Sequence, residues 1–138
     1  MPESIRALFS VLGRLCLITI FLMSALGNKI PKYAEVAEIM NSKEVPMPQV
    51  SLALAIVFLI LGSIMVLVGY YARIGAILLA VFLVLATYYF HPFWNFEEEK
   101  ARQNQMAHFM KNLGLFGAML FIIANGSGAG SLDDRKKA

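Results

Sequence analysis

The sequence predicts an all-α membrane protein, built as one antiparallel bundle of four transmembrane helices. Of its 138 residues, 59% are hydrophobic and only 15% are charged, and the mean hydropathy is +0.67. Ordinary soluble domains are about 45–50% apolar and about 25% charged, and so small a domain leaves much of its surface exposed. Lipid is therefore the expected solvent of this surface, and the length suits a single domain over residues 1–138.

Four segments are long and apolar enough to cross a bilayer, which takes about 20 residues in a helix. They are residues 5–26, 50–71, 73–91 and 106–126, and a polar tail that we expect to be frayed follows at 127–138. Backbone groups inside lipid need internal hydrogen-bond partners, which leaves helices or a closed barrel. Because polar and apolar residues do not alternate in these segments, we expect helices.

The connections between the segments indicate how the helices are joined. The polar stretch 29–49 contains "KYAEVAEIM", whose apolar residues recur at helical spacing and predict a short interfacial helix. The second and third segments follow each other almost directly and must form an antiparallel hairpin. Four crossings place both termini on one side of the membrane, and Arg73 in the short turn, with the basic tail at Lys136 and Lys137, favours the cytoplasmic side.

Arg14 lies in the apolar run "SVLGRLCLITIFLMSALGNK", one to two turns from the terminal side of the first segment. An ionisable residue at membrane depth is costly and is a candidate for function. The carboxylates all lie in loops or tails, at Glu3, Glu35, Glu38, Glu44, Glu97, Glu98, Glu99, Asp133 and Asp134. We therefore expect no carboxylate of this chain beside Arg14 at membrane level.

Two explanations for the neutralisation of Arg14 stay open. In the first, the guanidinium snorkels to lipid phosphate, with help from helix carbonyls, Ser10 or Ser63. In the second, it binds an anionic or carbonyl-bearing ligand or a carboxylate of a partner subunit, because its planar fork can hold two oxygens at once.

A second group of candidate residues belongs to the opposite end of the bundle. The topology places Lys29, His91, Trp94, His108, Lys111 and Asn112 there. The last three share one helix face because they are three and four residues apart. Such a basic mouth with an aromatic rim would bind an anionic headgroup, a quinone carbonyl or an acidic partner loop. Alternatively, the glutamates at 97–99 fold back and pair with these bases.

Several classes of function lack support in the sequence. The basic residues are dispersed, so we expect no binding of nucleic acid. His91 and His108 have no cysteine or acid at ligand spacing, so we expect no metal site. No nucleophile–base pair is present, and we expect no catalytic residue. Cys16, the one cysteine, lies in an apolar run and is expected to be buried and inert.

Several stretches, taken together and in order, resemble the DoxX family. They are "GRLCLITIFLMSALGNK", "VPMP", "LGSIMVLVGYYARIGA", "YYFHPFWNF", "HFMKNLGLFGAML" and the closing "GSLD". The resemblance implies a four-helix protein of the bacterial inner membrane. Members are associated with redox systems, including a subunit of a thiosulfate:quinone oxidoreductase, and related eukaryotic proteins act as cargo receptors or receptor-assembly chaperones.

The resemblance also carries over to individual residues. Positions of the family pattern are occupied by Arg14, Lys29, Arg73, His91, Trp94, Lys111 and Asn112. Many members carry a glutamate in the second helix, a turn before a glycine pair, whereas Leu59 stands at about that place here and the pair is Gly62–Ser63. The missing acid argues against a proton-coupled role.

These observations lead to two functional hypotheses. The first is an accessory subunit of a quinone-linked redox system, without a catalytic site, that binds quinone or lipid and docks a partner protein. The alternative is a small transporter, assembly or cargo-recognition protein that binds a lipid-like or anionic ligand. The candidate ligand-binding residues are Arg14, Lys29, His91, Trp94, His108, Lys111 and Asn112. Four short helices offer little interior, so a homo-oligomer is also expected.

Overall fold

The computed structural model describes residues 1–135, which form helices joined by short connections. Four helices are long and apolar enough to cross a membrane. These are α1 (Glu3–Ser24), α3 (Pro48–Val68), α4 (Ala72–Phe90) and α5 (Glu99–Asn125). The shorter elements are a π-helical turn η1 (Ala25–Lys29), α2 (Tyr33–Ser42), a 3₁₀ turn η2 (Phe93–Asn95) and α6 (Leu132–Arg135).

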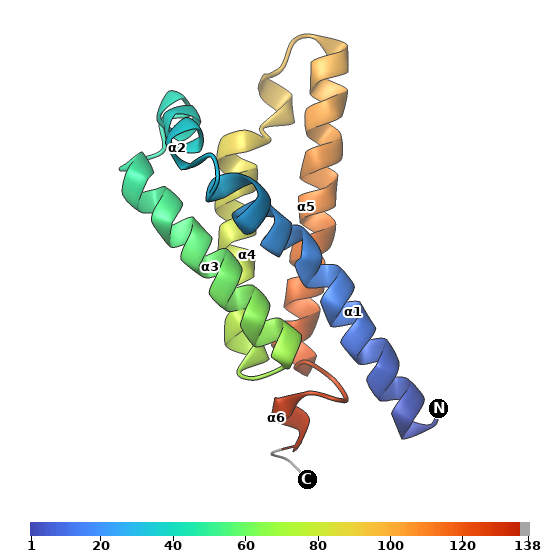
Figure 1. Cartoon of the computed structure of the whole chain (residues 1–138). Coiled ribbons are helices and arrows are strands. Elements are labelled where there is room, and N and C mark those ends of the chain that lie inside the picture. Colours follow the sequence, from blue (N-terminus) through green and yellow to red (C-terminus); the bar gives the residue numbers. More distant parts are fainter. Residues whose placement is uncertain (136–138) are drawn as a thin grey trace.

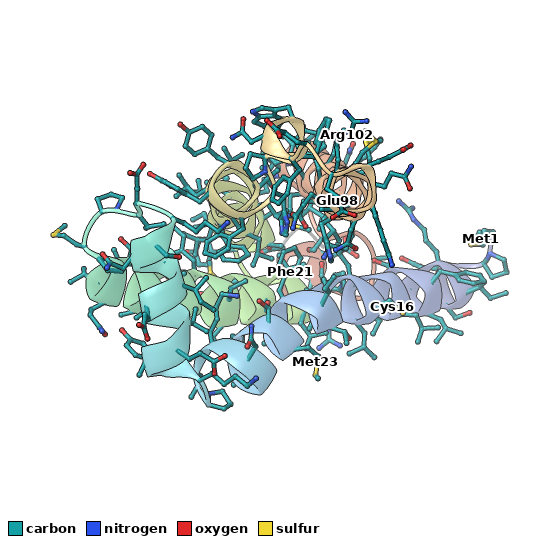
Figure 2. The ribbon with its side chains drawn as sticks, turned by 90° about the horizontal axis from the view of Figure 1, so that it is seen from above. Met1, Cys16, Phe21, Met23, Glu98 and Arg102 are labelled. Atoms are coloured by element: carbon teal, nitrogen blue, oxygen red, sulfur yellow. The ribbon has the colours of Figure 1, made fainter. Side chains whose placement is uncertain are left out.

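The four long helices form the predicted antiparallel bundle. Helices α3, α4 and α5 lie side by side, and α1 crosses them obliquely, packing mainly against α3 (Figure 1). Seen from above, the N-terminal part of α1 extends away from the other helices toward Met1 (Figure 2). Both described ends of the chain lie at one end of the bundle, and α2 lies at the other.

The helix boundaries follow the sequence with one clear exception. The interfacial helix predicted in "KYAEVAEIM" is α2, and the predicted hairpin is the turn between α3 and α4. The fourth spanning helix was expected from residue 106, but α5 begins at Glu99. The stretch from Glu99 to Gln105 is polar, so it extends the helix beyond the apolar segment without adding to the hydropathy signal.

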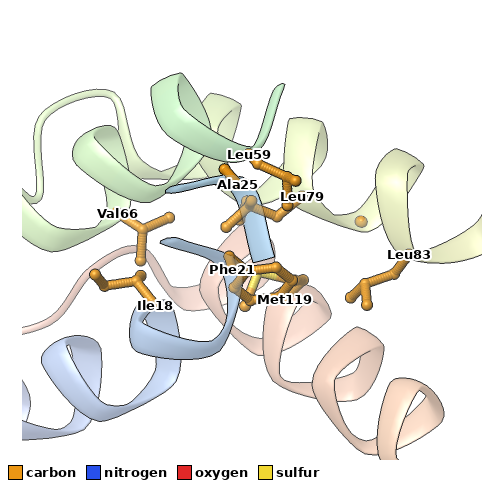
Figure 3. Close-up of a cluster of buried hydrophobic side chains, with 10 residues drawn as sticks. Ile18, Phe21, Ala25, Leu59, Val66, Leu79, Leu83 and Met119 are labelled. Atoms are coloured by element: carbon orange, nitrogen blue, oxygen red, sulfur yellow. The ribbon is translucent and has the colours of Figure 1, made fainter. Parts of the chain in front are cut away.

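The main core is small and lies where the four long helices meet. Its largest buried side chains include Ile18, Phe21, Leu59, Leu79 and Met119 (Figure 3). Many large apolar side chains of the long helices are instead exposed on the outside of the bundle. This distribution fits a protein in lipid, where packing and hydrogen bonds between helices replace the hydrophobic effect as the force that holds helices together.

Helices α3 and α4 approach each other backbone to backbone at two glycines. A Cβ atom added to Gly62 would lie 2.9 Å from the carbonyl oxygen of Gly75, and one added to Gly75 would lie 2.8 Å from that of Gly62. No larger residue fits at either position without moving a helix. The hairpin is therefore the most closely packed pair in the bundle, as expected for small residues at a membrane helix interface.

Candidate functional site

Arg14 is enclosed at the terminal end of the bundle by the chain itself. Its side chain is only 5% exposed. Its Nε donates a hydrogen bond to the carbonyl oxygen of Ser10 at 3.3 Å, and its Nη2 donates to that of Gly130 at 3.0 Å. The acceptors of the guanidinium are thus two backbone carbonyls, one from its own helix and one from the C-terminal tail.

The C-terminal segment 126–135 is docked against the bundle, which corrects the expectation of a frayed tail. The hydroxyl of Ser10 donates to the carbonyl oxygen of Ser127 at 3.0 Å, and the backbone N–H of Asp133 donates to that of Gly69 at 2.7 Å. Ser127 and Ser131 are buried. Residues 136–138, which the tail prediction included, lie outside the described part of the chain.

The carboxylate of Asp133, in the C-terminal tail, caps the N-terminus of α4. Its two carboxylate oxygens accept hydrogen bonds of 3.0 Å from the backbone N–H groups of Tyr71 and Ala72. The first N–H groups of a helix have no partner within the helix, and the N-terminus carries a partial positive charge. A carboxylate is therefore well placed there, and the tail supplies it over a separation of 62 and 61 residues.

Arg14 lies at the level where α3 ends and α4 begins. Gly69 follows α3 with a φ of 68°, and a Cβ atom at that position would lie 2.3 Å from Arg14 Nη1. The part of α1 before Arg14 extends past this level. Of the two serines considered as partners of Arg14, Ser10 contributes its carbonyl, whereas the buried Ser63 hydroxyl has no hydrogen-bond partner in residues 1–135.

The two histidines lie at the opposite end of the bundle, the end expected from the topology, and their rings are in contact there. The rings of His91, just after α4, and His108, on α5, are stacked with centroids 5.0 Å apart and planes at 18°. His91 Nδ1 lies 2.8 Å from Gln105 Oε1. Both rings are half-buried, and His91 is within electrostatic reach of Lys111 and Lys43.

Asn112 and Lys111 have different environments although they are neighbours in the sequence. Asn112 is buried, and its Nδ2 donates to Thr87 Oγ1 at 3.0 Å, which links α5 to α4. Lys111, by contrast, is exposed. Asn112 is therefore a contact between helices, and Lys111 is the member of the pair that remains accessible to a ligand or headgroup.

Lys29 lies at the end of η1, where the helix widens for one π turn. Its Nζ donates to Ser24 Oγ at 2.6 Å and lies 5.3 Å from the centroid of the Phe82 ring on α4. Single π turns often occur at functional positions in membrane and soluble helices. The turn brings a half-buried ammonium group against the bundle without a carboxylate in either of these contacts.

Trp94 belongs to an aromatic cluster and not to the polar pair. Its ring packs edge-on against Phe93 and Phe109, with centroids 5.3 and 6.2 Å apart, and the residue is 56% exposed. The three glutamates at 97–99 are exposed, and Glu99 accepts a hydrogen bond from Gln103 on its own helix. The structure therefore brings His91 and His108 together, with the aromatic cluster beside them.

The sequence reasoning missed the residues that hold the tail in place, above all Ser127, Gly130 and Asp133. One local signal was present, because "SLDD" at 131–134 has the spacing of a helix-capping sequence. The structure bears this out, since the backbone N–H of Asp134 donates to Ser131 Oγ at 3.1 Å. The expectation for Cys16 was wrong, because its side chain is exposed on the outside of α1.

Comparison with known proteins agrees with this architecture. The DoxX family profile matches residues 9–92, more than half of the chain. Inner membrane protein YphA of Escherichia coli (strain K12) is 26% identical over 130 residues, which cover 94% of this chain and 91% of that protein. Surfeit locus protein 4 homolog of Drosophila melanogaster is 29% identical over 82 residues, which cover 56% of this chain and 30% of that protein. No solved structure matches the chain. The chain therefore belongs to the DoxX family and is a small, multi-pass inner-membrane protein.

Proposed function

We propose that this protein is a non-catalytic membrane subunit of a quinone-linked redox system, and that it holds the oxygen-bearing ring of a quinone beside His91 and His108. The observation that carries the proposal is the stacked pair itself. One half-buried imidazole follows the last residue of α4 and the other lies in the first half of α5, and they offer hydrogen-bonding groups to a quinone ring at this end of the bundle.

The contacts of His91 favour a ligand that exchanges between carbonyl and hydroxyl forms. Gln105 Oε1 lies 2.8 Å from His91 Nδ1, and in the tautomer that carries its hydrogen on Nδ1 the other nitrogen, Nε2, offers a lone pair. That nitrogen can accept a hydrogen bond from a quinol hydroxyl and, once protonated, can donate one to a quinone carbonyl. The exposed Lys111 adds a positive charge nearby.

Arg14 is a weaker candidate for the same ligand. Its guanidinium is enclosed by the carbonyl oxygens of Ser10 and Gly130, and the tail would have to leave before a ring could reach it. The quinone proposal therefore concerns the end of the bundle where α2 lies.

The test is quinone binding by purified protein in lipid nanodiscs, with a short-chain ubiquinone as the probe. His108→Phe keeps an aromatic ring for the stack and removes the nitrogen atoms, so we expect at least tenfold weaker binding with normal folding. Arg102→Gln, an exposed change earlier on α5, is the matched control and should bind as the wild type does. Equal binding by the wild type and His108→Phe would refute the proposal.

The alternative, a small transporter, assembly or cargo-recognition protein, predicts a different outcome. Native-membrane purification would then recover a partner protein or an anionic ligand without any enriched quinone. His108→Phe and Lys111→Ala would change that retention and leave the redox turnover of the membranes unchanged.

The docking partner and the oligomeric state are part of the same proposal. The N-terminal half of α1 leaves the bundle and exposes Leu8, Phe9 and Leu12, a face that a second copy or a partner subunit would cover. Cross-linking in native membranes tests this face. A clean monomer without a cross-linked partner would contradict it.

We also propose that both termini face the cytoplasm, as the position of Arg73 in the α3–α4 turn favours. Labelling with a membrane-impermeant thiol reagent tests it, after Cys16→Ser removes the native thiol. A cysteine introduced by Glu98→Cys should react from outside intact cells, and one introduced by Glu3→Cys should not. The opposite pattern would reverse the topology.

A further inference from the structure

A hollow lies at the terminal end of the bundle, away from the histidine pair. Its volume is about 710 Å³, and it lies between the start of α1, the start of α4, the end of α5 and the docked tail. Residues of both charges line it, including Arg6 and Arg73 on one hand and Glu3 and Asp134 on the other. The quinone proposal makes no use of this hollow.

The hollow contains a buried polar group without a partner. Ser127 is 7% exposed and lines the wall, and its Oγ has no hydrogen-bond partner in residues 1–135. Its backbone carbonyl, by contrast, accepts the hydrogen bond from Ser10. The Oγ atom is itself covered by the protein, so it is not one of the groups that a ligand in the hollow binds.

Only some hydrogen-bonding groups of the charged residues in the wall are used by contacts within the protein. Arg73 uses Nη2 to donate to the carbonyl oxygen of Ala124 at 3.3 Å, which leaves its other donors. Asp133 also lines the hollow, but both of its oxygens accept from the N-terminus of α4. Two guanidiniums and two carboxylates, those of Glu3 and Asp134, therefore remain for a ligand.

The hollow lies at the depth of lipid headgroups. Its walls include the first residues of α4 and Asn125, the last residue of α5, so it is level with the ends of two membrane-spanning helices. Ile74 and Ala129 add apolar wall. A molecule with a polar head and an apolar continuation fits this position better than a freely soluble anion.

We propose that this hollow binds the headgroup of a phospholipid that carries both a phosphate and a primary ammonium, as phosphatidylethanolamine does. Arg6 and Arg73 bind the phosphate oxygens, since guanidinium forks suit phosphate geometry. Glu3 and Asp134 bind the ammonium. The mixture of signs distinguishes this headgroup from an anionic one, which the two carboxylates would repel.

The experiment is native mass spectrometry of the purified full chain with added phosphatidylethanolamine, phosphatidylcholine or phosphatidylglycerol. The wild type should retain phosphatidylethanolamine several-fold more than either of the other lipids. Arg73→Gln should weaken retention by about tenfold, because a hydrogen bond to a charged group is lost. Arg102→Gln, at the opposite end of the bundle, is the matched control.

Asp134→Asn tests the contact with the ammonium separately from the contact with the phosphate. It should abolish the preference for phosphatidylethanolamine over phosphatidylglycerol while the phosphate is still bound. Soluble phosphoethanolamine and inorganic phosphate identify the source of the ligand, because neither should raise the melting temperature as the lipid does. Equal retention of the three lipids by the wild type would overturn the proposal, and so would equal stabilisation by soluble phosphoethanolamine.

Discussion

The guanidinium of Arg14 donates a 3.0 Å hydrogen bond to the carbonyl oxygen of Gly130, 116 residues later in the chain. This contact joins the first membrane-spanning helix to the tail that follows the last one. The same tail reaches the turn between α3 and α4 through Asp133. The terminal end of the bundle is therefore held together by the last described residues, and several variants test this arrangement.

Asp133→Ala should destabilise the protein by about 0.5–2 kcal/mol, the usual cost of removing a helix-capping side chain. The two N–H groups of Tyr71 and Ala72 would lose their acceptor. Thermal unfolding in detergent measures the effect. Asp133→Asn should recover only part of it, because the asparagine amide has a single acceptor oxygen for the two N–H groups and no negative charge. Asp134→Ala removes an exposed neighbouring carboxylate and should have a smaller effect; equal losses for Asp133→Ala and Asp134→Ala would contradict the capping role.

Arg14→Met should release the tail while α1 keeps its length and apolar packing. The hydrogen bond to Gly130 would be lost, and bonds to charged groups contribute about 1.5–3 kcal/mol, equivalent to tenfold or more in the opening equilibrium. Hydrogen exchange of the amides in 127–133 should therefore accelerate by about that factor. The exposed Arg102→Met serves as the control. Unchanged exchange in the tail would show that Arg14 does not hold it.

Gly69→Ala should damage the same end of the bundle by a different route. Gly69 has a φ of 68°, and its new Cβ would lie 2.3 Å from both Arg14 Nη1 and Ser131 Cβ. We expect a lower melting temperature and faster exchange in the tail. Gly114→Ala is the matched control, because nothing lies within 4 Å of its Cβ position on α5 and alanine favours a helix by about 1 kcal/mol. The two substitutions should thus have opposite signs, and a neutral Gly69→Ala would be inconsistent with the packing described.

Asn112→Ala tests the hydrogen bond between α5 and α4. Loss of the hydrogen bond from Asn112 to Thr87 should lower the free energy of unfolding by about 0.6–2 kcal/mol, the range measured for hydrogen bonds between membrane helices. A double-mutant cycle with Thr87→Val isolates the contact from the loss of volume. A coupling energy near zero would mean that the two side chains act independently.

The four-helix bundle could be predicted from sequence because length and apolar composition are local properties. The stripe of α1 that packs inward is also regular, since Arg14, Ile18, Phe21 and Ala25 recur at helical spacing. Cys16 lies off this stripe, and in a uniformly apolar helix composition does not distinguish the packed side from the lipid side. That is why the expectation of a buried thiol was wrong.

The acceptors of Arg14 were only half predictable. The carbonyl of Ser10 lies one turn away, and helix carbonyls were considered as partners. Gly130 is remote in sequence, and its carbonyl belongs to a tail whose composition is typical of a frayed end. A polar composition indicates that a segment is usually exposed to solvent. It does not predict the few hydrogen bonds to backbone groups by which this tail docks. The topology placed His91 and His108 at the same end of the bundle, but their stacking was not predicted, because it depends on how α4 and α5 pack.

The cap on α4 has a consequence for biosynthesis. The ribosome makes Tyr71 and Ala72 before Asp133, which lies 62 and 61 positions later, so α4 is synthesised before the carboxylate that caps it. The cap on α4 can form only when the final stretch of the chain has been translated. Nascent chains halted before Asp133 would therefore lack both hydrogen bonds to the start of α4, so this end of the bundle is completed only as the last residues are made.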